Sequence, residues 1–111
     1  MIEIVLRDYA AAALQVPVFL EIPAAPPTRF VVLKRSGAGR ERFLENGNLI
    51  ADSYAESLFE AASLNEKVKS VLDSLDTLDE VGMVQLSADY PVIDTDNKRY
   101  RYQAVYEINH Y

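Results

Sequence analysis

The 111-residue chain contains no cysteine, so neither a disulfide framework nor a thiolate metal site can form. It has a single histidine, His110, at the penultimate position, which leaves little material for histidine-based nucleophilic catalysis. Basic residues are also scarce: 11 lysines and arginines stand against 17 acidic residues, giving a net charge of −6. Because like charges repel, this balance argues against sequence-specific binding of DNA or RNA.

Long apolar runs are missing as well. No segment approaches the about 20 consecutive apolar residues of a membrane span. Glu3, Arg7 and Asp8 interrupt the apolar start of the chain, whereas the apolar region of a signal peptide is unbroken. We therefore expect a soluble, cytosolic protein with no membrane partner. Half of the residues are apolar, which is enough for the core of one domain over residues 1–111.

Two segments have the 3.6-residue periodicity of amphipathic helices. The first covers residues 2–14 and ends before Pro17, which cannot continue a helix. The second covers about 54–75. Ser53 and Glu56 form a capping-box pattern that predicts where this second helix begins.

Strand patterns occupy much of the remaining chain. The predicted strands are 16–22, 30–33, 49–54, 81–87 and 99–111, and the predicted turns are 34–42, 46–48 and 94–97. The nearly continuous apolar run at 30–33 indicates a central strand, and the alternation through 99–111 indicates a strand with one solvated face. Together the segments predict an α+β fold: an antiparallel or mixed sheet of about four to five strands, with two helices packed on one face.

No segment carries a convincing catalytic pattern, so we expect neither an enzyme nor a bound cofactor or metal. Asp94 begins a run that resembles a calcium loop, but Arg99 and Val105 stand where that loop requires glycine and glutamate. The glycines of residues 37–39 follow a strand, as in a dinucleotide-binding loop, but Arg42 occupies the third glycine position and no helix opens there. Plain turns explain both segments better.

One basic cluster stands out in this acidic chain. It lies on the glycine-bearing segment 34–42, and a solvated turn is the simpler explanation for it. The alternative is an arm that reaches an acidic neighbouring subunit, where charge complementarity sets the register. The final predicted strand offers a second such surface. The candidate interface residues are therefore Lys34, Arg35, Arg40, Glu41, Arg42, Arg99 and Arg101.

Short segments spread over nearly the whole chain also carry a family resemblance. They are residues 16–23, 30–33, 39–41, 53–58, 64–68 and 98–106. Together they resemble short proteins encoded in the tail gene clusters of phages and prophages of Gram-positive bacteria. The layout is also similar to that of the tail terminator, or tail-to-head joining (tail completion), proteins of long-tailed phages.

The resemblance implies a structural virion assembly protein that forms a ring on the tail tube. Its partners would be further copies of itself, for example in a hexamer, and tail tube or connector proteins. Its place would be the virion tail or head–tail junction, after assembly in the host cytoplasm. Two alternatives stay open: a small acidic phage-encoded binding module or regulator that acts on a host protein, and a small hydrolase or nuclease that uses carboxylates and a hard metal ion.

Overall fold

The computed structural model describes the backbone of residues 2–41, 44–94 and 99–111. The elements are α1 (Ile2–Leu14), β1 (Val18–Phe19), β2 (Phe30–Glu41), β3 (Leu44–Ala55), α2 (Leu58–Leu72), the 3₁₀ turn η1 (Leu75–Thr77), β4 (Val81–Asp94) and β5 (Arg99–His110). The strands form one sheet in the order β1-β2-β3-β5-β4, in which only β1 and β2 are parallel. The predicted α+β fold is confirmed.

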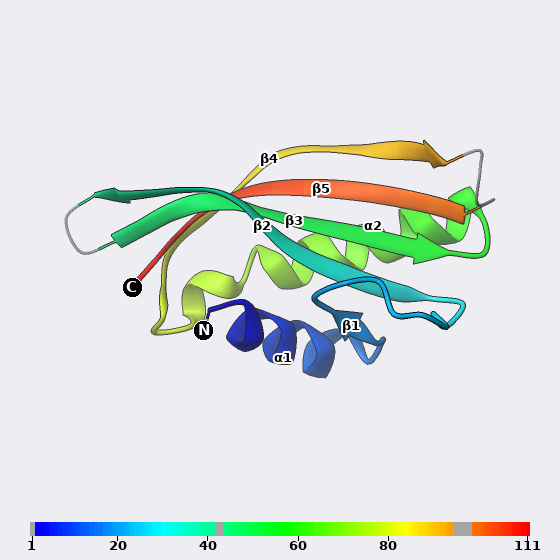
Figure 1. Cartoon of the computed structure of the whole chain (residues 1–111), viewed down its shortest axis with the longest axis horizontal. Coiled ribbons are helices and arrows are strands. Elements are labelled where there is room, and N and C mark those ends of the chain that lie inside the picture. The colour runs from blue at the N-terminus through cyan, green and yellow to red at the C-terminus, as the bar shows by residue number, and fades with distance from the viewer. Residues whose placement is uncertain (1, 42–43, 95–98) are drawn as a thin grey trace.

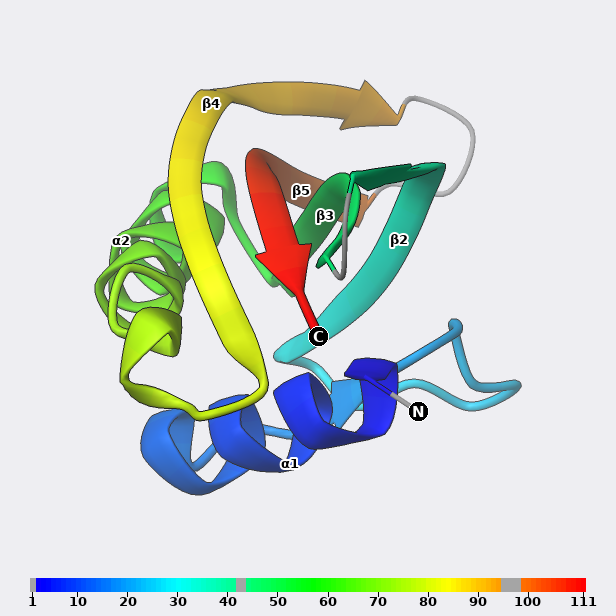
Figure 2. The same cartoon turned by 90° about the vertical axis from the view of Figure 1, so that its left-hand side faces the viewer.

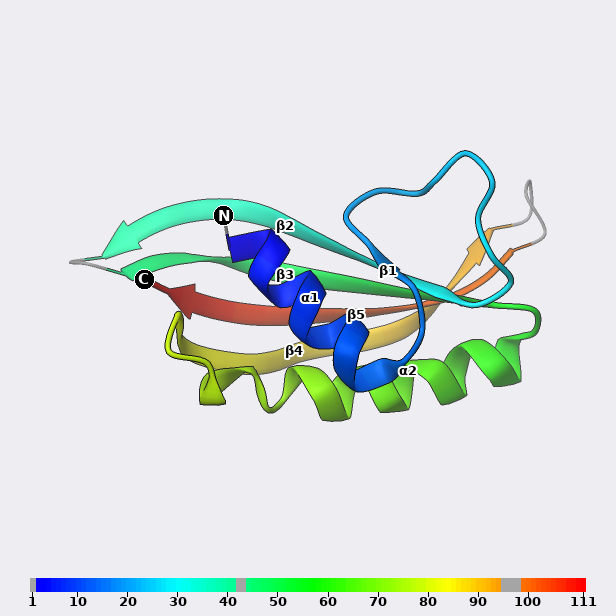
Figure 3. The same ribbon diagram turned by 90° about the horizontal axis from the view of Figure 1, so that it is seen from below.

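Both helices lie against the same side of the sheet (Figures 1 and 3), which we call the covered face. The opposite side, which carries no helix, is the open face. Figure 2 looks along the strands and shows how strongly the sheet twists. The core lies between the covered face and the helices, and its buried members include Leu6, Val31, Leu33, Leu49, Ala51, Leu64, Val68, Leu72, Ala104, Tyr106 and Ile108.

The start of β2 is buried on both faces, as its continuous apolar run predicts. Val31 and Leu33 enter the core under the helices. Phe30 and Val32 point to the open face and form a second, smaller cluster with Tyr54 of β3. This placement follows from the alternation of side chains along a strand.

The turn predicted at 34–42 is wrong over most of its length, because β2 continues to Glu41 and pairs with β3. Gly37 has a positive φ of 72° beside a bulge in this ladder, a backbone angle that glycine adopts at little cost. Gly47 lies within β3, so the turn predicted at 46–48 is also wrong. A Cβ atom on Gly47 would lie 2.8 Å from the Gly37 carbonyl oxygen, so the bulge requires glycine there.

The second helix begins later than predicted. Tyr54 and Ala55 extend β3, and α2 begins at Leu58 with Ser57 as its N-cap. The Ser57 Oγ atom accepts a hydrogen bond from the Glu60 backbone N–H at 3.1 Å. The Ser-x-x-Glu pattern therefore occurs twice in succession, and pairing with β5 keeps the earlier copy extended.

The outer strands differ most from their predicted lengths. The strand predicted at 16–22 is reduced to β1, and Pro17 precedes this edge strand as expected. The strand predicted at 81–87 continues to Asp94. Most of the turn predicted at 94–97 lies outside the described residues, whereas β5 matches its prediction closely. None of the described helices is long and apolar enough to cross a membrane.

Candidate assembly surfaces

A buried carboxylate lies at the centre of the open face. The Asp52 side chain on β3 is 0% exposed, although no helix covers it. Its Oδ2 atom lies 2.8 Å from the Lys34 ammonium of β2 and 3.5 Å from the Arg101 guanidinium of β5, and its Oδ1 atom accepts a hydrogen bond from Gln103 at 3.0 Å. Two cations thus share one anion, so the cluster carries a net positive charge in an acidic protein.

An aromatic stack adjoins this charged cluster. The Phe30 and Tyr54 rings are nearly parallel, with centroids 4.6 Å apart, and Phe19 meets Phe30 edge-on at 6.0 Å. The Arg101 guanidinium lies 5.7 Å from the Tyr54 ring centroid, in range of a cation–π contact. At the far side of the face, the Tyr90 hydroxyl donates to Gln103 at 2.7 Å. The open face is therefore an ordered surface.

The structure brings together only part of the predicted interface set. Lys34 and Arg101 meet at Asp52 on the open face. Arg35 points to the covered face instead, where its guanidinium pairs with Glu3 of α1 at 2.9 Å. Arg99 begins β5, at the opposite end of that strand from His110.

The other predicted interface residues are the last two of β2 and the residue that follows them in the sequence. Arg40 and Glu41 belong to β2, but their side chains are outside the described set, and Arg42 lies outside the described residues altogether. Sequence reasoning missed Asp52, the residue around which Lys34 and Arg101 gather. The signal for it was an aspartate within a predicted strand. The two basic residues are its diagonal neighbours, since Lys34 pairs with Ile50 and Arg101 pairs with Tyr54.

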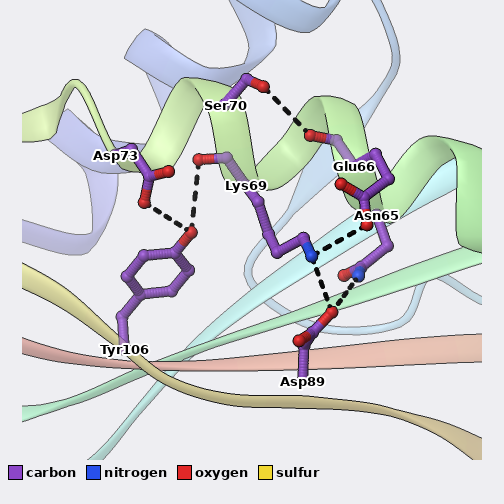
Figure 4. Close-up of polar contacts among 7 residues, drawn as sticks. All are labelled: Asn65, Glu66, Lys69, Ser70, Asp73, Asp89 and Tyr106. Carbon is purple, nitrogen blue, oxygen red and sulfur yellow. Dashed lines mark hydrogen bonds and ion pairs between the residues drawn. The ribbon is translucent and has the colours of Figure 1, made fainter.

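A second polar network fixes α2 to β4 and β5 (Figure 4). Asp89 of β4 accepts hydrogen bonds from Asn65 at 3.0 Å and from Lys69 at 2.9 Å. The Tyr106 hydroxyl of β5 lies 3.0 Å from the Asp73 carboxylate and 3.2 Å from the Lys69 carbonyl oxygen. The Asp89 contacts join the helix to β4 and the Tyr106 contacts join it to β5, so the network orients α2 on the sheet.

The charges of this network shift its proton equilibria. Hydrogen bonds from Lys69, and then from Asn65, hold the pKa of Asp89 below its usual value despite partial burial. The carboxylates of Glu66 and Asp89 raise the pKa of Lys69. Burial, together with the neighbouring Asp73 carboxylate, raises the pKa of the Tyr106 phenol. All three groups keep their ordinary neutral-pH charge states, so the network is structural rather than poised for proton transfer.

Exposed apolar side chains occur at two further places, on β4 and near the start of α2. On the edge strand β4, Met83, Leu86 and Tyr90 are each at least 37% exposed. Near the start of α2, Phe59 is 77% exposed and borders a hollow of about 320 Å³ that also touches Tyr102 of β5. Exposed aromatic and aliphatic groups of this kind are typical of protein interfaces.

The described residues form no cluster of metal ligands, and their single histidine is buried. Within residues 2–41, 44–94 and 99–111, no group of three or more histidine and acidic side chains could hold a metal ion. His110 is nevertheless well held: it is only 4% exposed, because the end of β5 pairs with both β3 and β4.

Comparison with known proteins identifies a similar fold. No protein-family model matches the chain, and no curated protein matches it. Among solved structures, the chain is similar to one described as the virion of a native gene transfer agent (GTA) particle, with a TM-score of 0.70. The match covers 91% of this chain and 83% of the other, at 12% sequence identity. At this identity, the likeness shows a shared fold.

Proposed function

We propose that the protein is a structural virion component without catalytic activity, acting as a tail terminator or head–tail joining subunit in a ring on the tail tube. The observation that carries the proposal is the whole-chain fold likeness to a chain of the gene transfer agent virion. The segment resemblance to phage tail proteins supports the same role independently, because it rests on sequence runs rather than on shape.

The surfaces of the subunit suit assembly into a ring. A closed ring needs two different patches on each subunit, since each copy contacts its neighbours head to tail. The chain offers a cationic patch at Lys34 and Arg101 on the open face and an apolar patch at Phe59 beside α2. We assign these two patches to subunit contacts. The net charge of −6 also suits a ring through which DNA passes without sticking, since like charges repel.

Light scattering coupled to size exclusion tests the proposal, with the protein alone and with tail tubes assembled from the tube protein of the same genome. We expect a ring that caps the tube ends in electron micrographs. Phe59→Ser should weaken capping of the tube at least about tenfold. It should not lower thermal stability, because the Phe59 side chain is exposed to solvent. Ile22→Ser, at a 48% exposed position in the loop after β1, is the matched control and should cap normally. A protein that neither self-associates nor binds tubes would refute the role.

A further inference from the structure

The charged cluster on the open face keeps one positive charge in excess. Lys34 and Arg101 share the single carboxylate of Asp52, so one cation has no counter-charge within the cluster. In the described part of the chain, the Arg101 guanidinium makes hydrogen bonds only through Nη1, at 3.5 Å to Asp52 and 3.5 Å to the Tyr54 hydroxyl. Its remaining N–H groups are therefore available to a group from outside the subunit.

The two cations are accessible and are held in place. The Lys34 side chain is 45% exposed and that of Arg101 is 23% exposed. Asp52 fixes the ammonium at 2.8 Å, and the Tyr54 ring, itself stacked on Phe30, lies beside the guanidinium. Donors that are already ordered lose little conformational entropy on binding. A guanidinium also matches the two oxygens of a carboxylate.

The surroundings favour an acidic protein segment over a nucleic acid as the anionic partner. Phe30 and Tyr54 are 2% and 6% exposed, so their rings cannot stack on unpaired bases. Glu107 is exposed on the same side of β5 as Arg101, and the whole chain has a net charge of −6. A phosphate backbone would meet repulsion around the cluster, whereas one carboxylate side chain can reach it alone.

The chain contains a segment with the complementary charge. Residues 73–80 run from the end of α2 through η1 to the start of β4 and contain no basic residue. We call this segment the acidic turn, and its four exposed carboxylates belong to Asp73, Asp76, Asp79 and Glu80. No ion pair among the residues that the structure describes involves Asp76, Asp79 or Glu80.

The acidic turn lies where local helix energetics disfavour negative charge. It follows the C-terminus of α2, the negative end of the helix dipole, where cations are normally stabilising. Lys69 is the basic residue in the last turn of α2, but Glu66 and Asp89 already bind its ammonium. A segment that departs from a local stability rule is a candidate for function. Here a cationic partner outside the subunit would offset the repulsion.

The two charged surfaces cannot meet within one subunit. Figure 1 shows η1 and the turn after it below the sheet, at one end of the molecule, on the side of the helices. The Asp52 cluster lies on the opposite side of the sheet, which no helix covers. Two different surfaces on opposite sides of a subunit produce head-to-tail contacts between copies, as a ring requires.

We infer that the acidic turn of one copy docks on the open face of the next copy, where one of its carboxylates bridges Lys34 and Arg101. The inference rests on the proposed ring for its biological setting and identifies what contacts the cationic patch in that ring. Because the contact joins exposed charges, added salt weakens it.

The first experiment changes the open face. Arg101→Gln removes the excess charge and leaves the 2.8 Å pair of Lys34 with Asp52 in place. It should weaken self-association at least about tenfold at low salt, measured by light scattering coupled to size exclusion. Lys67→Gln removes one cation from an exposed position on α2 and should associate like the wild type. Urea denaturation checks that both variants fold.

The second experiment changes the acidic turn. Neutralising its three unpaired carboxylates should also weaken self-association at least about tenfold, although a lower net charge by itself would reduce repulsion between copies. The variant is Asp76→Asn/Asp79→Asn/Glu80→Gln. The matched control removes three negative charges from exposed positions elsewhere and should not weaken association. It is Asp8→Asn/Glu21→Gln/Glu66→Gln.

Mixing the two defective proteins tests the pairing directly. Arg101→Gln retains the acidic turn and the triple variant retains the open face, so an equimolar mixture should form heterodimers but no rings. If wild-type rings persist in both variants, the docking inference is wrong and the ring stands. If Arg101→Gln loses only tube capping while self-association is unchanged, the tube protein is the occupant and the inference is wrong.

A different outcome would count against the ring alone. If the wild type associates through these two surfaces but never caps tubes, the ring proposal fails and the contact stands. A wild type that stays monomeric with and without tubes would refute both.

Discussion

The two faces of the sheet are both ordered, but by different interactions. The covered face is mostly apolar where α1 and α2 lie on it, and its polar contacts join Arg35 to Glu3 of α1 and Asp89 and Tyr106 to the α2 segment. The open face has no helix, yet at its centre Asp52 is as buried as any core residue. Long side chains from the neighbouring strands shield that carboxylate. A sheet face without a covering layer can therefore bury a side chain at its centre, provided that the long side chains around it are held in place by ion pairs.

Substitutions on the two faces should lower the free energy of unfolding by different amounts. On the covered face, Leu72 is fully buried against the sheet. Leu72→Ala should lower the free energy of unfolding by about 3 kcal/mol, because it removes apolar contacts and leaves a cavity. Urea denaturation measures the change. Ile22→Ala, at an exposed position, is the control and should cost less than about 0.5 kcal/mol.

On the open face, Asp52→Ala should cost about 2–3 kcal/mol, somewhat less than the core truncation. It leaves two cations facing each other, but the Lys34 ammonium remains in contact with water and moderates the cost. Asp52→Asn retains the hydrogen bond to Gln103 and should recover part of the loss. In a double-mutant cycle with Lys34→Ala, additive costs would contradict the shared ion pair.

The β2–β3 ladder offers a steric test of how tightly the sheet is paired. Gly47→Ala should cost about 2 kcal/mol, because its Cβ atom would press on the Gly37 carbonyl oxygen and force the backbone to shift. Gly39→Ala is the matched control, since a Cβ atom there meets nothing within 4 Å. Thermal denaturation of both variants compares their stability. Equal melting temperatures would show that the ladder can accommodate a Cβ atom at position 47.

In the core under the helices, Tyr106→Phe should lower the free energy of unfolding by about 1 kcal/mol. The change removes the buried hydroxyl that contacts Asp73 and the Lys69 carbonyl oxygen. Tyr90→Phe removes an exposed hydroxyl from the open face and should be nearly neutral. The two variants together compare hydrogen bonds of the same chemistry on the two faces by urea denaturation.

The smallest effect concerns pH. Because the pKa of Asp89 is lowered in the folded chain, its stabilising contribution is present above the unfolded pKa of about 4 and is lost as the pH falls through the folded pKa. At pH 7, Asp89→Asn should therefore cost about 0.5 kcal/mol. The difference between variant and wild type should shrink below pH 4. A constant difference down to pH 2 would mean that the ion pair with Lys69 does not contribute.

The sequence predicted elements whose pattern is local. The periodicity of α1, the apolar start of β2 and the alternation along β5 each identified their element, and together they yielded the fold class. Boundaries failed where tertiary contacts override local signals. Ser53 has the cap pattern, but β5 keeps it in the sheet, and the glycines at 37 and 47 are turn formers that here accommodate each other across a bulge.

The candidate site was predictable only in part. Basic residues near the hairpin drew attention to Lys34, but period-two alternation sends Arg35 to the other face, so the apparent cluster in the sequence is divided by the sheet. Lys34 and Arg101 lie close together because both contact Asp52, and this arrangement requires the strand order β2-β3-β5. Likewise, the burial of His110 follows from its two flanking strands, which no local pattern reveals.

The strand order also bears on how the chain folds. β2 with β3, and β4 with β5, are hairpins whose strands are adjacent along the chain and close over short loops. The ladder between β3 and β5 is different, because it joins residues as distant as Glu45 and His110 and encloses α2. Closing that long loop carries the largest chain-entropy cost. We therefore expect the docking of the two preformed hairpins around α2 to set the folding rate, with substitutions in the β3–β5 ladder slowing folding more than those in either hairpin loop.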